Sequence, residues 1–413
     1  MAEQTTLLTG RNLPPVRDWG AGDVEGITFD PVLAELMRDG PLARIRLPHG
    51  EGWAWLATRY EDVRMIAGDP RFSRAAAVER PVTRPAPHLE PDPGTLAFAE
   101  GADHQRLRRT VESALTDSAV ERLRPHAQQM LDELVDGLLH DGPPADLVER
   151  VLQPFPAAVA CEVMGVPSGE RRQVQAWVRS IGSADGCADT ARRAKDALAS
   201  LYEWIGTAVR ERHGSADTDV LSLLGAAVGR GEISEAEAVG IAGPLQTGGE
   251  AVTHTCGQML FLMLTEPALY ERLRARPETR AAAVEELLRH LPHRASVGLA
   301  RVALEDVDVH GVRISAGEPV YLSYLAANRD PDVFPDPDRL DVGRDAGATL
   351  PHLAFGSGPH HCAGAALART QTELLVDTLL DRLPGLRLAV HVDQVPFRRR
   401  AMIRGPRALP VRW

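Results

Sequence analysis

The sequence Phe355-Gly-Ser-Gly-Pro-His-His-Cys-Ala-Gly364 leads directly into the helical pattern Ala365-Ala-Leu-Ala-Arg-Thr-Gln-Thr-Glu-Leu374. Glycines at positions 356, 358 and 364 allow the backbone to turn tightly and to approach a flat ligand closely. Cys362 lies just before the start of the predicted helix, where free N–H groups and the helix dipole favour an anion. The position therefore favours the thiolate form of Cys362.

A thiolate at this position suits a soft metal ion or a haem iron, and two other interpretations stay open. Cys362 could be an inert buried thiol. It could also form a zinc site with His352, His360 and His361, although adjacent side chains do not turn easily towards one tetrahedral centre and no second ligand pair follows at zinc spacing. The remaining cysteines are far apart and are predicted to be buried or incidental thiols; they are Cys161, Cys187 and Cys256.

The pattern Phe355-x-x-Gly358-x-His360-x-Cys362-x-Gly364 resembles the haem-binding signature of the cytochromes P450 at every position. The resemblance implies that Cys362 is the proximal iron ligand, that His360 reaches a haem propionate and that Phe355 packs beside the thiolate. It also implies the mainly α cytochrome P450 fold with a smaller β-region. The cofactor would be haem b (iron protoporphyrin IX), with electrons from an external ferredoxin and its NAD(P)H-dependent reductase.

Two further motifs support the resemblance. Glu286 and Arg289 lie three residues apart, so both fall on one helix face and can pair. An isolated pair of this kind is common on solvated helices, but here it resembles the ExxR motif of the family, whose role is structural. His104 and Arg108 resemble a haem-propionate clamp, with a solvated basic face as the plainer interpretation, and Arg301 resembles a third propionate contact.

The segment 241–267 resembles the long central helix of the family that passes over the haem, and it departs from the usual pattern. Pro244 and the pair Gly248-Gly249 predict a local bend. The family pattern Ala-Gly-x-Asp/Glu-Thr is here Thr247-Gly-Gly-Glu250-Ala251, so the acid is present but alanine replaces the alcohol. Alanine can neither steady bound oxygen nor relay protons.

The candidate catalytic positions on this helix are therefore Glu250, Ala251, Thr247 and Gln246. Thr247 lies one turn before Ala251 on the same face, with Gln246 beside it, whereas Thr253 points to the other side. A plainer interpretation is that Thr247 and Gln246 only satisfy the bent backbone. Two reactions stay open: hydroxylation or a related monooxygenation, with a substrate hydroxyl or a water completing the proton relay, and oxidative C–C or C–N coupling of aromatic or indole substrates, such as cyclic dipeptides, without oxygen insertion.

Composition agrees with an enzyme of this size and excludes some partners. The chain has 413 residues, of which 44% are hydrophobic and 25% charged, as in globular proteins. A net charge of −11 disfavours nucleic-acid binding. The N-terminus has no signal-peptide pattern and the longest apolar run, 259–264, is too short to span a membrane. We expect a cytoplasmic protein with a small-molecule substrate, and the substrate is expected to be a secondary metabolite.

Periodicity predicts an irregular lead-in over residues 1–20 and a single catalytic domain over 21–413. Helices are expected at 30–38, 59–68, across most of 103–279, and at 364–383. Strands are expected at 43–47 and 52–58, in a hairpin of 302–309 with 311–319, and in the tail 386–413. The proline-rich stretch 78–95 predicts a loop, and 328–344 predicts a meander.

The remaining expectations concern partners and substrate. Substrate contacts are expected from 78–98, 296–299 and 401–403, besides Gln246, Thr247 and Ala251. Arg106 and Arg109 could dock an acidic ferredoxin, or could form a plain solvated face. A non-enzymatic haem sensor or carrier would need a partner domain, which the sequence does not contain.

Overall fold

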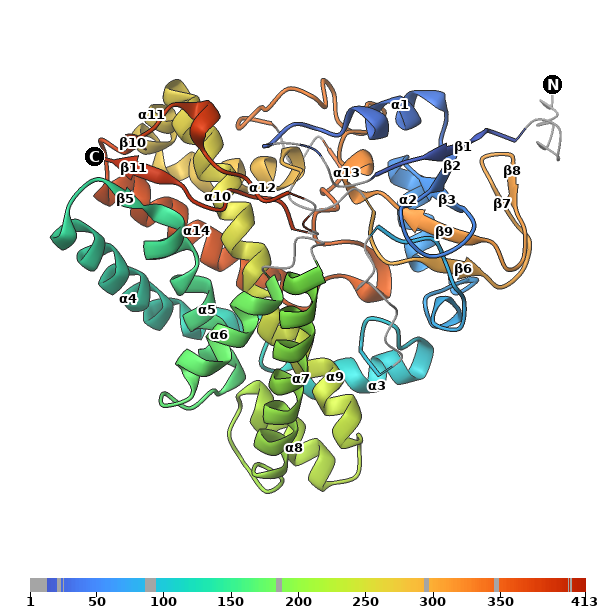
Figure 1. Ribbon diagram of the computed structural model, residues 1–413, viewed down its shortest axis with the longest axis horizontal. Coiled ribbons are helices and arrows are strands. Elements are labelled where there is room, and N and C mark those ends of the chain that lie inside the picture. Colours follow the sequence, from blue (N-terminus) through green and yellow to red (C-terminus); the bar gives the residue numbers. More distant parts are fainter. Residues whose placement is uncertain are drawn as a thin grey trace.

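The computed structural model describes residues 13–20, 24, 26–85, 94–182, 188–292, 297–344, 349–399, 401 and 403–413. A large helical part and a smaller part rich in β-structure lie side by side (Figure 1). The helical part contains α3 to α12 and α14, and the β-rich part is formed by both the N-terminal residues and residues after 300. The mainly α fold with a smaller β-region, expected from the sequence, is confirmed.

The first helix has a side-chain cap at its N-terminus. Asp30 caps α1, because its Oδ1 accepts the N–H groups of Val32 and Leu33 at 2.9 and 3.3 Å. The helices in this part and the next have the following bounds: α1 Pro31–Asp39, α2 Tyr60–Gly68, α3 Gly101–Glu112, α4 Asp117–Asp141, α5 Pro154–Met164, α6 Arg171–Gly182, α7 Ala188–Arg210 and α8 Val220–Gly229.

The central helix is interrupted where the sequence predicted a bend. It is divided at Gly248 into α9 (Glu235–Thr247), which contains Pro244, and α10 (Gly249–Thr265). Twelve of the residues of α10, from Val252 to Leu264, are buried. The later helices are α11 Pro267–Ala275, α12 Arg280–His290, α13 Tyr324–Ala327 and α14 Ala365–Arg382.

Three sheets make up the β-rich structure. The largest has the strand order β1-β2-β3-β9-β6-β4, and the others are β10-β11-β5 and the two-stranded β7-β8. The strand bounds are β1 Val16–Asp18, β2 Leu42–Arg46, β3 Ala54–Ala57, β4 Phe72–Ser73, β5 Ala145–Asp146, β6 Arg301–Ala303, β7 Val307–Val309, β8 Val312–Ile314, β9 Pro319–Leu322, β10 Arg387–Leu388 and β11 Pro410–Arg412. The six-stranded sheet therefore combines strands from both ends of the chain.

The main core surrounds the central helix. Met259 and Met263 of α10, Leu375 and Leu379 of α14, and Phe155 of α5 are fully buried members of one apolar cluster. Figure 1 shows α10 passing through the middle of the molecule with α14 behind it. This packing fixes the central helix against the helix that follows Cys362, so the two segments that matter for the site are held together.

The expected hairpin of 302–309 with 311–319 is confirmed. Strand β7 pairs with β8, and Val302 of β6 pairs with Pro319 of β9 in the same register. At the open end of the hairpin β6 also pairs with β4, which joins it to the large sheet.

Two other expectations are wrong in detail. Residues 16–18 of the expected lead-in form β1, which pairs in parallel with β2. Among its described residues, the tail contains only the short strands β10 and β11. The pairing of β1 with β2 joins distant segments, which local periodicity does not encode.

No helix among the described residues is long and apolar enough to cross a membrane.

Candidate active site

The cysteine loop is held in shape by its own backbone. The Cys362 N–H donates to the Phe355 carbonyl at 2.9 Å, and His361 N–H donates to Gly358 at 3.0 Å. Gly356 and Gly358 have positive φ values of 79° and 73°, which confirms that both are needed for the turn. A Cβ on Gly358 would also lie 2.6 Å from the Ala67 carbonyl oxygen. Cys362 is exposed at the end of this turn, just before α14.

The reason for a glycine at position 364 differs from that at positions 356 and 358. It caps α14 with a φ of −91°, and a Cβ there would meet no heavy atom within 4 Å. Neither backbone conformation nor packing within the protein requires glycine at this position. Its role in the close approach of a flat ligand stays a prediction.

A network that the sequence did not reveal anchors the loop from behind. The guanidinium of Arg369 on α14 lies 4.5 Å from the centre of the Phe355 ring. Its Nε donates to Glu285 Oε1 at 2.8 Å, and His352 Nε2 lies 3.0 Å from Glu285 Oε2. Burial would raise the pKa of Glu285, but the hydrogen bonds of His352 and Arg369 outweigh it and lower the pKa to about 2. Phe355 is thus tied to α12 through an ion-paired chain.

The expected ExxR pair is present and fully engaged. Arg289 binds Glu286 with two hydrogen bonds, Nε to Oε2 at 2.7 Å and Nη2 to Oε1 at 2.8 Å, and both side chains are buried. Arg289 Nη1 also donates to the carbonyls of Asn328 and Pro337, while Arg344 Nε donates to Glu286 at 3.1 Å. The pair therefore fastens α12 to the meander 328–344, as a structural motif should.

The residues expected at the haem edge converge. The rings of His104 on α3 and His360 on the cysteine loop are 4.4 Å apart, centre to centre. Arg301 is buried on β6. Burial lowers the pKa of His360 to about 2, and the positive charges of Arg74, His104, Arg301 and Arg108 add to this effect. Arg108 itself donates to the carbonyls of Pro359 and His361 at 3.2 and 2.8 Å, so it also ties α3 to the loop.

This group of cations fits a dicarboxylate ligand such as haem. Arg301 Nη2 and Arg74 Nε are both buried and have no hydrogen-bond partner among the described residues. Burial lowers the pKa of Arg301 and lowers that of Arg74 to about 9, because positive charge is costly there without an anion. Among the described residues, the acid near these arginines is Glu100, which accepts from Ser73 Oγ and Arg74 N, both at 2.6 Å. Two propionates would supply the missing negative charge.

The interrupted central helix has one open face. Pro244 and Gly248 are exposed, while Thr247 and Ala251 are half-buried, and the spacing of these four places them on one side. The Thr247 hydroxyl donates to the carbonyls of Gly243 and Pro244, each at 3.2 Å. For Thr247, the plainer interpretation that it satisfies the bent backbone agrees with these contacts.

Gln246 and Glu250 lie on a different face, so placing Gln246 beside Thr247 in the site is wrong. Gln246 is buried and its Nε2 donates to Cys161 Sγ at 3.8 Å. Glu250 Oε2 lies 3.3 Å from His254 Nε2. With Thr253, both residues line a small cavity of about 10 Å³ against α5 and α6, close to the space of one water molecule. Spacing could have shown this, because 246, 250 and 253 share one helical face.

The alternative sites receive no support. Among the residues that the structure describes, no three His, Cys, Asp or Glu side chains are grouped to hold a metal ion, which argues against zinc. Cys161 and Cys256 are buried, and burial raises the pKa of Cys161 and raises that of Cys256 to about 12, so both are inert thiols as expected. Cys187 lies outside the described residues, as does Ser296 of the expected substrate contacts.

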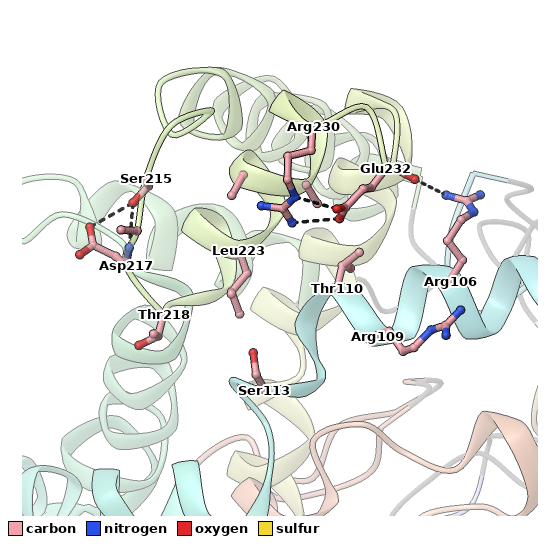
Figure 2. Close-up of a pocket in the computed structure, with 13 residues that line it drawn as sticks. Arg106, Arg109, Thr110, Ser113, Ser215, Asp217, Thr218, Leu223, Arg230 and Glu232 are labelled. Atoms are coloured by element: carbon pink, nitrogen blue, oxygen red, sulfur yellow. Dashed lines mark hydrogen bonds and ion pairs between the residues drawn. The ribbon is translucent and has the colours of Figure 1, made fainter.

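A surface cavity of about 600 Å³ between α3, α8 and the segment 215–218 contains none of the expected site residues (Figure 2). Arg106, at its edge, donates to Glu237 Oε1 at 2.6 Å and to the Glu232 carbonyl at 3.0 Å. Its charge is therefore paired within the chain, which removes the reason to assign it to a ferredoxin. Arg109 donates through Nε to the Gln105 carbonyl at 3.2 Å, and its docking role stays a prediction.

Comparison with known proteins agrees with this geometry. The model of the family described as "Cytochrome P450" matches residues 188–384. Biflaviolin synthase of Streptomyces coelicolor is 65% identical over 413 residues, covering all of both chains. Mycinamicin IV hydroxylase/epoxidase of Micromonospora griseorubida is 39% identical, over 96% of this chain and 98% of that one.

A solved structure has the same fold. Cytochrome P450mel, described as having biaryl coupling reactivity, superposes with a TM-score of 0.90 at 38% identity, covering 97% of this chain and 100% of that one. The relatives are oxidative enzymes, and the family uses haem, a small-molecule substrate and electrons from a redox partner. The chain belongs to the cytochrome P450 family and is an oxidoreductase that tailors secondary metabolites by oxidation.

Proposed function

We propose that the enzyme binds haem b between the cysteine loop and the open face of the central helix, with Cys362 as the iron ligand. The observation that carries this proposal is the convergence of exposed Cys362, His360 and buried, unpaired guanidinium groups around one loop. His104, Arg108, Arg301 and His360 would hold the propionates through charge-assisted hydrogen bonds. Phe355, Gly358 and Gly364 would shape the loop under the ring. The cytoplasmic location stays a prediction.

When bound, the haem supplies oxidising chemistry from O₂ and two electrons, and thiolate ligation favours O–O cleavage. The protein contributes the thiolate, the propionate contacts and control over protons. Because Ala251 has no hydroxyl and the Thr247 proton is already donated to backbone carbonyls, neither side chain is poised to release a proton. Protons would reach the reaction through a water molecule or a hydroxyl group of the substrate.

Glu250 would act from the side of the helix that lies away from the open face. Its carboxylate lies against His254 and beside the small cavity behind the helix. A water molecule in that cavity would have Gln246 Oε1, which lacks a partner among the described residues, and Glu250 as neighbours. The proposed role of Glu250 is to bind this water behind the interrupted turn, with Gln246 helping to position it, so that a proton can pass through the water.

The electron donor we propose is a ferredoxin that is reduced by an NAD(P)H-dependent reductase. Support comes from the family, whose members of this kind take electrons from a separate partner. Arg109, with its guanidinium beside the surface cavity in Figure 2, is a candidate contact for an acidic ferredoxin.

The reaction we propose first is hydroxylation or a related monooxygenation, in which one oxygen atom enters the product and the other leaves as water. The mycinamicin relative, named as a hydroxylase/epoxidase, supports it. A second candidate is the joining of two phenolic aromatic rings, with loss of one hydrogen from each ring and no oxygen inserted. The name biflaviolin synthase and the biaryl coupling of cytochrome P450mel favour this candidate. Nothing in the comparisons favours indoles or cyclic dipeptides.

Product mass separates the two reactions. The purified holoenzyme would be supplied with a ferredoxin, its reductase, NADPH and ¹⁸O₂, with flaviolin as the first substrate, beside a Cys362→Ser control. A product that gains one labelled oxygen supports monooxygenation. A product of two substrate units without label supports ring coupling. If haem-loaded enzyme with full electron supply changes neither flaviolin nor a panel of other phenols and macrolides, the proposed substrate range is wrong.

A further inference from the structure

Arg74 was not singled out in the sequence, yet the sheet places it beside Arg301. Strands β4 and β6 are antiparallel, with Phe72 opposite Ala303 and Ser73 opposite Val302. Continued by one residue, this register brings Arg74 opposite Arg301. Both arginines are almost fully buried, with 8% and 2% of their surface exposed. Two buried guanidinium groups therefore lie next to each other at the edge of the proposed haem site.

Among the described residues, the contacts of Arg74 leave its guanidinium without a carboxylate partner. Its backbone N–H, not its guanidinium, donates to Glu100 Oε1. The second oxygen of Glu100 accepts from the Ser73 hydroxyl. Arg74 Nη1 donates to the Ala97 carbonyl at 3.1 Å, and Nε has no partner among the described residues. Buried arginines are normally paired, so this geometry indicates that an anion belongs beside Arg74.

The neighbourhood identifies which anion fits. Tyr324, whose hydroxyl would lie 3.7 Å from a Cβ on Gly356 of the cysteine loop, interacts with both Arg74 and Arg301. Arg74 is also among the charges that act on His104 and His360. It thus faces the same space as the expected propionate contacts His104, His360 and Arg301. The pKa values of both histidines are lowered by burial, so the positive charge there comes from the guanidinium groups of Arg74, Arg301 and Arg108. With Glu100 already engaged, these three exceed what a single carboxylate could neutralise.

We propose that Arg74 is a further cofactor-positioning residue, which binds a haem propionate together with Arg301 and His360. This inference rests on the proposed haem site. It gives Arg74 a role in retaining the cofactor and in setting its charge environment, separate from the recognition of substrate. Because a charge-assisted hydrogen bond is at stake, loss of the guanidinium should speed haem dissociation about tenfold.

The test measures the transfer of haem from holoenzyme to excess apomyoglobin, without any turnover. Arg74→Gln is compared with wild type, with Arg74→Lys and with Arg80→Gln. Arg80 is a matched control, because it lies on the same segment, is exposed and donates to the Gly317 carbonyl at 2.7 Å. We expect about tenfold faster loss for Arg74→Gln, an intermediate rate for Arg74→Lys and no change for Arg80→Gln. The haem midpoint potential should fall in Arg74→Gln alone, since a nearby positive charge favours the reduced form.

Reconstitution with the dimethyl ester of haem isolates the propionate contact. In the ester both propionates are uncharged, so wild type and Arg74→Gln should lose it at the same rate. If the two proteins differ equally with haem and with the ester, Arg74 acts through the fold and the proposal is overturned. Unchanged haem loss with weakened substrate binding would overturn it too, and would assign Arg74 to a substrate anion. If Arg74→Gln yields no holoprotein, the Arg74→Lys comparison carries the test.

Failure of the underlying haem proposal would look different. It would appear in the wild type itself, as a protein that does not retain haem, whereas failure of the Arg74 inference leaves a normal wild-type holoenzyme.

Discussion

Two groups of buried arginines in this molecule differ in how completely their guanidinium groups are paired. In the ExxR group, Arg289 has a buried carboxylate and three backbone carbonyls, and Glu286 accepts from Arg289, Arg344 and the Asp341 N–H. In the haem-edge group, Arg74 and Arg301 are just as buried but each has a nitrogen without a partner among the described residues. The first group is complete among the described residues, and for the second we propose an anion from outside the chain.

This difference in pairing indicates which buried arginines maintain the fold and which are expected to bind a ligand. Where a buried charge is fully paired by its own chain, removal of one partner leaves the other charge uncompensated and should damage the fold. A buried charge without a partner lowers the stability of the ligand-free protein, and its presence makes sense only if a ligand repays the cost. Arg289 lies in α12, Arg301 lies on β6 and Arg74 follows β4 directly. Their three-dimensional contacts show which of these charges the described chain itself pairs.

Arg289→Ala should give the largest effect. It leaves Glu286 buried without its main partner, so we expect the free energy of unfolding to fall by about 3–5 kcal/mol. Chemical denaturation of the purified protein measures it. Arg274→Ala is the matched control, because Arg274 forms an exposed i,i+3 pair with Glu271 and should cost less than about 1 kcal/mol. Equal losses in the two variants would remove the distinction on which the comparison depends.

Arg301→Met should change the free energy of unfolding of the ligand-free protein in the opposite direction, towards higher stability. Because an unpaired buried cation is replaced by an apolar side chain of similar length, the haem-free form should gain about 1 kcal/mol of stability. The same variant should lose haem at least tenfold faster, as followed by haem transfer. A large loss of stability without haem would show that Arg301 is a structural residue like Arg289.

Glu285→Gln should change the acid stability by about 1 kcal/mol, since Glu285 is 40% exposed and solvent screens its ion pairs. The folded-state pKa of about 2 lies below the ordinary 4.5, so the native carboxylate contributes stability that is full above about pH 4.5 and is lost as the pH falls towards 2. Denaturation at several pH values between 6 and 2.5 would measure this slope. Replacement by Gln should lower stability at pH 6 and flatten the slope; an unaltered slope would mean that Glu285 does not hold Arg369 and the loop.

Ala251→Thr should have the smallest effect, within about twofold on turnover. A water or substrate hydroxyl already completes the proposed proton path, so a new alcohol adds little. Turnover and hydrogen peroxide release would be measured with the native substrate. If the added hydroxyl raises turnover and suppresses peroxide, the substrate- or water-assisted relay is wrong.

Local features of the fold were predictable because their physical cause is local. Asp30 precedes an apolar periodic segment and caps α1, and the 3.6-residue pattern after Gly364 gives α14 almost to the residue. The ExxR pair and the cysteine loop follow from short motifs with fixed geometry. These signals do not depend on where distant segments lie.

The rest depends on contacts across the chain. The pairing of β4 with β6 puts Arg74 beside Arg301, although 227 positions separate them in sequence, and no local pattern contains that register. Arg369 reaches Phe355 and Glu285 only after α12 and α14 pack together. Helical spacing could have predicted the side of the helix on which Gln246 lies. The break at Gly248 made it harder to decide which residues before and after it share one face.

The central claim is thiolate-bound haem at Cys362, and the absorption spectrum of the reduced protein with carbon monoxide tests it most directly. Wild type should show the strongly red-shifted Soret band of a thiolate-ligated haem, and Cys362→Ser should lose that band while Arg274→Ala keeps it. A fresh wild-type protein that holds no haem, or whose band is unshifted, would contradict the account.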